Sequence, residues 1–143
     1  MIDFFSKDEE GRIIATIKEA EKQTSGEIRV HLERDYQGSI LGAAYRTFLA
    51  LGMERTKERN GVLIFIVPDR HDFAIYGDRG INAKVPAHFW EDVRNLMQEH
   101  FRKGMFAEGV CRAVELSGEK LKAYFPWEKG DKNELADEIS YGR

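Results

Sequence analysis

The stretch NGVLIFIVPDRHDFAIYGDRGI, residues 60–81, decides how the rest of this chain must fold. Residues 61–67 are apolar at every position, whereas a strand with one solvated face alternates apolar and polar residues. This run therefore predicts a central strand that is covered on both faces. Residues 68–72 predict a turn, and residues 72–77 predict a strand that returns antiparallel to the first.

Upstream of this hairpin, the pattern predicts a helix, a strand and a second helix. Ser6 and Glu9 have the spacing of a capping box, in which each side chain bonds the other residue's backbone amide. Apolar residues at helical spacing then indicate a helix over about residues 7–23. Residues 27–33 (EIRVHLE) alternate like a strand with one buried face, and an apolar stripe over residues 41–51 predicts the next helix.

Downstream, two more helices are expected before a charged tail. Pro86 suits the first turn of the third helix, and we expect its apolar stripe to be core, through Phe89, Trp90, Val93, Leu96, Met97 and Phe101. The fourth helix is expected over residues 106–125, because Pro126 ends it. We therefore expect one domain over residues 1–126 and a charged C-terminal tail over 127–143, with Leu135, Ile139 and Tyr141 as the tail residues able to dock.

The order of these elements predicts the fold. A strand, a helix and a second strand joined by a crossover of this length indicate a parallel strand pair. The returning hairpin strand makes the sheet mixed. Burying the central strand requires two or more helices on each face of the sheet. The predicted class is α/β, a three-layer α/β/α sandwich in which a small mixed sheet carries helices on both faces.

Composition limits the function. The chain has 143 residues, of which 42% are apolar and 33% charged, as in one globular domain. Its net charge is −3 and no basic stretch is concentrated, which argues against a nucleic-acid partner. The single cysteine, Cys111, excludes an internal disulfide, and the histidine spacing matches no zinc motif. We find neither a secretory signal nor an apolar run of membrane-spanning length, so we expect a cytoplasmic protein without a membrane span.

The expected strand directions bring three polar, glycine-bearing segments to one edge of the sheet, namely TSGE (24–27), RNG (59–61) and GDRGIN (77–82). Carboxylate, amide and backbone carbonyl oxygens are the ligands of a hard cation such as calcium or magnesium. The candidate metal ligands are Glu27, Asp78, Asn60, Gly26 and Asn82. The alternative is that the glycines only permit tight entry into the strands, and that Asp78 pairs with Arg79 or caps a turn.

The opposite edge of the sheet carries Glu33, Arg34, Asp35, Asp69, Arg70 and His71. Ligands of open α/β sheets usually bind outside the carboxyl ends of parallel strands, which is this edge. However, only two of the expected strands are parallel, and no glycine-rich phosphate cradle follows them. We therefore expect a solvated hairpin turn here.

The segments TSGEIRVHLE, ERNGVLIFIV, FAIYGDRGI and HFRKGMFAEGVCRAVELSGEKL resemble those of the TPM domain family over about residues 8–125. The resemblance implies an α/β/α fold with a cleft at the sheet edge and divalent-cation binding, often calcium. Acid phosphatase activity is ascribed to plant members. Glu27 and Asp78 match acidic positions of the family's motifs. Many bacterial relatives add a signal peptide, a transmembrane helix and a glycine-rich tail, which this sequence does not show, so membrane roles are not carried over.

Three hypotheses of function follow. The leading one is a TPM-domain protein that binds a divalent cation, calcium or magnesium, at the sheet-edge cleft, so that Asp78→Asn abolishes calcium-dependent stabilisation and leaves the metal-free fold nearly unchanged. The second is a metal-assisted acid phosphatase with Asp78 as nucleophile and Arg79 as phosphate clamp, although no leaving-group acid is apparent. The third is a domain that docks a protein partner without catalysis.

Overall fold

The computed structural model describes residues 4–128 and 137–142, and its centre is a four-stranded sheet with the strand order β3-β2-β1-β4. Strands β1 (Glu27–Leu32) and β2 (Gly61–Val67) are parallel, and β3 (Asp72–Gly77) runs antiparallel to β2. All seven residues of β2 are buried, because the strand is covered on both faces. The predicted mixed sheet and its central strand are confirmed.

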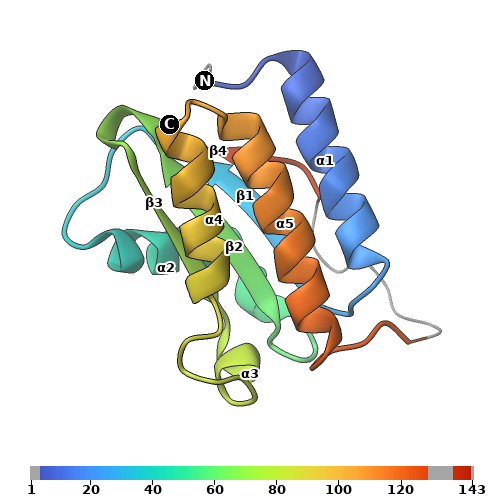
Figure 1. The fold of residues 1–143 in the computed structure, drawn as a ribbon. Coiled ribbons are helices and arrows are strands. Elements are labelled where there is room, and N and C mark those ends of the chain that lie inside the picture. Colours follow the sequence, from blue (N-terminus) through green and yellow to red (C-terminus); the bar gives the residue numbers. More distant parts are fainter. Residues whose placement is uncertain (1–3, 129–136, 143) are drawn as a thin grey trace.

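Three long helices cover one face of the sheet and one covers the other (Figure 1). Helices α1 (Lys7–Glu21), α4 (Glu91–Arg102) and α5 (Phe106–Lys122) lie side by side, with α5 in the middle. Helix α2 (Ile40–Ala50) packs on the second face, beside the short 3-10 helix η1 (Met53–Arg55). The three-layer sandwich is confirmed. Two or more helices were expected on each face; within the described residues, the second face carries one α-helix, α2, and the short 3-10 helix η1.

Strand alternation divides the apolar core into two parts. On the face beneath α1, α4 and α5 lie Ile28, Val30, Leu32, Val62, Ile64 and Ile66. On the α2 face, Leu63, Phe65 and Val67 pack with Ala44, Phe48 and Met53. Each fully buried side chain of this size stabilises the fold by roughly 1.5–3 kcal/mol. The smaller second core needs only α2 and η1 to cover it.

The ends of the helices follow local signals where those signals exist. The capping box of α1 is present, since Ser6 Oγ accepts from the Glu9 amide at 3.1 Å and Glu9 Oε1 accepts from the Ser6 amide at 2.9 Å. Helix α4 begins at Glu91 rather than at Pro86. Residues 86–91 instead form successive turns, closed by bonds from Phe89 N to Pro86 O and from Glu91 N to His88 O, both at 3.1 Å.

The short elements η1, η2, α3 and β4 were not expected from the sequence. Helix α3 (Arg79–Asn82) follows β3 directly, and the short 3-10 helix η2 (Pro68–Arg70) forms part of the turn between β2 and β3. Strand β4 (Ser140–Tyr141) lies parallel to β1 and covers part of its outer edge. Ile139 joins the core and Tyr141 packs against it, whereas Leu135 lies outside the described residues.

Buried His31 fastens β4 to β1. Its Nδ1 lies 2.7 Å from Ser140 Oγ, its Nε2 lies 3.0 Å from Glu33 Oε1, and its ring stacks on Phe65. Burial lowers the pKa of His31, so the imidazole is neutral at neutral pH. Among the helices of the described residues, we find none that combines the length and the apolar character needed to cross a membrane.

Candidate functional site

The three glycine-bearing segments meet at the end of the sheet where β1 and β2 begin, which we call the amino edge (residues 24–27, 58–61 and 77–82). The Glu27 amide donates to Asn60 O at 3.3 Å, and the Asp78 amide donates to Gly61 O at 3.0 Å. Helix α3 closes this edge, because the Gly80 amide donates to Arg59 O at 2.9 Å. The strand directions expected from the sequence therefore do bring the segments together.

Asp78 is buried at the amino edge and its carboxylate is fully engaged. Its Oδ2 accepts from Arg59 Nε at 2.7 Å, and its Oδ1 accepts from Arg59 Nη2 at 3.1 Å and from the Arg79 amide at 2.7 Å. The same bonds raise the pKa of Arg59. Asp78 thus caps α3, as the alternative interpretation held, but the guanidinium that it pairs with belongs to Arg59 rather than to Arg79.

The structure requires glycine at position 80, one of the two glycines that flank Asp78 and Arg79. A Cβ atom at this position would overlap the carbonyl oxygen of Glu58 and lie 2.5 Å from that of Arg59. Both are backbone atoms, so they have no rotamer by which to move away. The backbone of α3 therefore approaches residues 58–59 so closely that only glycine fits.

The two asparagines differ in what they leave available. Asn82 Nδ2 donates to Gly77 O at 3.2 Å, which fastens α3 to the end of β3. Asn60 Nδ2 donates to Ser25 Oγ at 3.2 Å, while its Oδ1 is buried and accepts no hydrogen bond from the described residues. Gly26 lies next to Asn60, since a Cβ on Gly26 would be 3.4 Å from Asn60 O. Asn60 therefore keeps one buried oxygen for a ligand.

Glu27 is 2% exposed and lies beside a second carboxyl group that the sequence analysis missed. Glu21, the last residue of α1, accepts from the Ile28 amide at 2.9 Å through Oε2. Burial, together with hydrogen bonds to the carboxyl groups of Asp137 and Glu27, raises the pKa of Glu21 well above its usual range. The sequence did contain one signal for this pair of carboxyl groups: Glu21 and Glu27 lie on either side of the TSG turn between α1 and β1.

The five predicted ligands do not all stay available to one cation. Asp78 and Asn82 make structural bonds, and Glu27 hydrogen-bonds Glu21. Glu27, Asn60 and Gly26 lie together at the entrance of β1 and β2. In residues 4–128 and 137–142, no group of three or more His, Cys, Asp or Glu side chains is arranged to hold a metal ion. What the amino edge offers is half-buried Glu21 and buried Glu27 beside the Asn60 side-chain oxygen.

Comparison with known proteins identifies relatives of the whole chain. The family model described as the TPM domain matches residues 2–120. The NMR structure of the BA42 protein from the psychrophilic bacterium Bizionia argentinensis is 43% identical, with a TM-score of 0.94 over 99% of this chain and 98% of that one. No curated protein matches this chain significantly.

Two more distant solved structures share the fold alone. The N-terminal domain of the cg2496 protein from Corynebacterium glutamicum is 12% identical, with a TM-score of 0.63 over 97% of this chain and 80% of that one. The N-terminal domain of a protein from P. gingivalis is 20% identical, with a TM-score of 0.67 over 85% and 78% of the two chains.

Proposed function

The chain belongs to the TPM domain family, and we propose that it binds a divalent cation at the amino edge, with Glu21 and Glu27 as carboxylate ligands. One observation carries this proposal. Half-buried Glu21 contacts the carboxyl groups of buried Glu27 and of Asp137, so ionising them together is costly unless a positive charge lies close to them. A proton fills that role below the raised pKa of Glu21, and a hard cation would fill it by displacing this proton as pH rises.

The remaining donors favour calcium or magnesium over a transition metal. Both cations take oxygen ligands, and calcium accepts six to eight in a flexible arrangement. Glu21 and Glu27 would supply two carboxylates, and the buried Asn60 Oδ1 and the Gly26 carbonyl are further oxygen donors of the same edge. With so few carboxylates, water must complete the shell, so we expect weak binding, with a Kd of about 10⁻⁴–10⁻³ M.

Calcium titration of the melting temperature at pH 8 tests the proposal. A cation that binds only the folded protein stabilises it by about 2.7 kcal/mol at a hundredfold excess over Kd. We expect Glu27→Gln to abolish this rise, because it removes one of the two ligand charges. Glu119 is an exposed glutamate on α5, so Glu119→Gln is the control for the loss of one negative charge. This variant should keep the full calcium-dependent rise in melting temperature.

Asp78→Asn distinguishes this ligand set from the one centred on GDRG. Because Asp78 holds Arg59, the variant should melt at a lower temperature without metal, contrary to the expectation of an unchanged fold. It should nevertheless keep the calcium-dependent rise. Loss of the rise in Asp78→Asn with retention in Glu27→Gln would move the site to α3, and no rise in the wild type at 10 mM calcium would disprove cation binding.

The phosphatase hypothesis gains no support from the amino edge. Asp78, the suggested nucleophile, is engaged by Arg59 and by the Arg79 amide, so its oxygens are not presented to a substrate. Arg79 is exposed, and no hydrogen bond joins its guanidinium to Asp78. We therefore propose cation binding at this edge without hydrolysis.

A further inference from the structure

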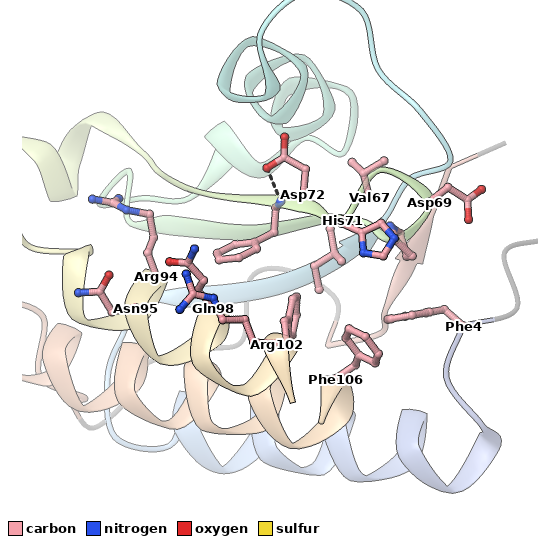
Figure 2. Close-up of a pocket in the computed structure, with 14 residues that line it drawn as sticks. Phe4, Val67, Asp69, His71, Asp72, Arg94, Asn95, Gln98, Arg102 and Phe106 are labelled. Atoms are coloured by element: carbon pink, nitrogen blue, oxygen red, sulfur yellow. Dashed lines mark hydrogen bonds between the residues drawn. The ribbon is translucent and has the colours of Figure 1, made fainter. Parts of the chain in front are cut away.

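A cavity of about 670 Å³ lies at the opposite end of the sheet, between the β2–β3 turn and helix α4 (Figure 2). We call it the carboxyl-edge cavity. The hairpin turn itself is solvated as expected, since Asp69, Arg70 and His71 are exposed, but a cavity lies beside it, because Val67 and Phe73 form one wall and α4 forms the other. Its volume is within the range of small-molecule sites, and its position outside the carboxyl ends of parallel strands is where α/β sheets bind ligands.

The floor of the cavity is aromatic. Phe73 meets Phe101 edge to face with ring centroids 5.4 Å apart, and Phe101 meets Phe106 at 5.3 Å. Phe4 continues the row at 5.1 Å from Phe106. All four rings are only partly buried although they pack together, so their remaining apolar surface faces the cavity. This surface fits the flat apolar body of an aromatic ligand.

Helix α4 adds positive charge above this floor. Arg94, Gln98 and Arg102 are four residues apart and so follow one another on the same side of the helix, along the cavity. Among the described residues, the guanidinium groups of Arg94 and Arg102 form no ion pair or hydrogen bond with a protein group. A guanidinium presents up to five donors in a planar fork that matches a carboxylate or a phosphate.

The acidic groups of the cavity do not neutralise these arginines. Asp72 Oδ2 accepts from Tyr36 Oη at 2.8 Å and its Oδ1 accepts from the Phe73 amide at 2.9 Å. Figure 2 shows the Asp72 carboxylate on the side of the strand away from α4, and Asp69 at the outer end of the turn. The α4 wall therefore presents unpaired positive charge beside an aromatic floor.

We propose that the carboxyl-edge cavity binds a small organic anion, with its carboxylate or phosphate on Arg94 and Arg102 and its ring on the phenylalanine floor. Because the cavity and the amino edge lie at opposite ends of the sheet, this site is independent of cation binding. The charged group supplies specificity and the ring supplies most of the buried surface. Neither part alone should bind well.

An NMR titration with four ring compounds of similar size tests the proposal. The probes are phenyl phosphate, phenylacetate, neutral benzyl alcohol and cationic benzylamine. We expect saturable shifts with the two anions, centred on the amides of residues 67–73 and 94–106, and at least about tenfold weaker binding of the neutral and cationic probes. Comparison of the two anions then shows whether the site prefers phosphate or carboxylate.

Variants of exposed residues give a matched test. Arg94→Gln with Arg102→Gln should weaken binding of the better anion at least about tenfold, because both forks are lost. Lys103→Gln also removes a positive charge from the end of α4, but Lys103 lies outside the cavity. The affinity of this variant for the anion should therefore equal that of the wild type. An unchanged affinity in the double variant, equal binding of benzyl alcohol, or no saturable shift at 20 mM anion would each overturn the proposal.

Discussion

The two ends of the sheet differ in whether their charged groups have partners. At the amino edge, the charge of Asp78 is buried and paired, and the glycine of α3 allows backbones to touch. At the carboxyl edge, Arg94 and Arg102 stay unpaired beside an aromatic cavity. The difference teaches that a polar motif in the sequence is a weaker sign of a ligand site than a charge which the fold leaves without a partner.

Of the changes at the two edges, the largest expected loss of stability follows the substitution of Gly80 at the amino edge, where only glycine fits. Gly80→Ala should destabilise the protein by about 3 kcal/mol, the upper range for overpacking, because its Cβ would overlap backbone oxygens of residues 58–59. Chemical denaturation measures the loss. Gly11→Ala, at an open helical position, is the control and should stabilise by about 0.5–1 kcal/mol. A loss below about 1 kcal/mol for Gly80→Ala would show that α3 moves easily.

A smaller effect is expected for the carboxyl edge. Phe101 is only partly buried, because it lines the cavity, so Phe101→Ala should cost about 2 kcal/mol rather than the 3–5 kcal/mol of a fully buried phenylalanine. Fully buried Phe48→Ala is the comparison and should reach that higher range. Urea unfolding of both variants measures the difference. Equal losses would mean that Phe101 belongs to the closed core and not to a binding surface.

The smallest effect is a change of stability with pH at the amino edge. The raised pKa of Glu21 means that the folded state holds a proton that the unfolded state releases above pH 4.5. Stability from this group is therefore fully present below about pH 4.5 and is lost as pH rises from there through the raised pKa of Glu21. We expect the metal-free protein to melt lower at pH 9 than at pH 6.

Glu21→Gln is the control for this pH dependence, because glutamine is neutral at both pH values and has nearly the same shape. The variant should show a smaller difference in melting temperature between pH 6 and pH 9 than the wild type. Calcium should act in the same direction as the mutation, because a cation replaces the proton. Identical pH profiles for the wild type and Glu21→Gln would show that the Glu21–Glu27 pair does not store a proton.

Most of the sheet could be predicted because its signals are local and repeated. The unbroken apolar run of β2 specifies burial on both faces, and the structure confirms it. The alternation of β1 identifies a strand, but the prediction of one solvated face is wrong, because five of its six residues are buried, Glu27 and His31 among them. Short elements carry no such repeat. Helix α3 is a single turn of four residues, and β4 consists of two residues that pair with a strand more than a hundred positions earlier. Periodicity cannot detect either one.

The candidate sites show a similar limit. Strand direction was enough to predict that the glycine-bearing segments meet, but it did not reveal which guanidinium Asp78 would take. Arg79 is the neighbour of Asp78 in sequence. The guanidinium that binds the Asp78 carboxylate is nevertheless that of Arg59, which lies just before the adjacent strand β2. The cavity had a visible signal that was not used, since Arg94, Gln98 and Arg102 repeat every four residues on one side of a helix. The aromatic floor came from four separate segments and had no local signature.

Strand β4 also bears on how the chain is made and kept intact. Among the described residues, the outer edge of β1 gains its backbone partners at His31 and Leu32 from residues 140–141, so a ribosome must synthesise about a hundred further residues after β1 before that edge is covered. An uncovered strand edge is a template for pairing with another chain. Nascent or proteolytically trimmed molecules that lack residues 140–141 would therefore share a route to self-association that is closed once β4 pairs with β1.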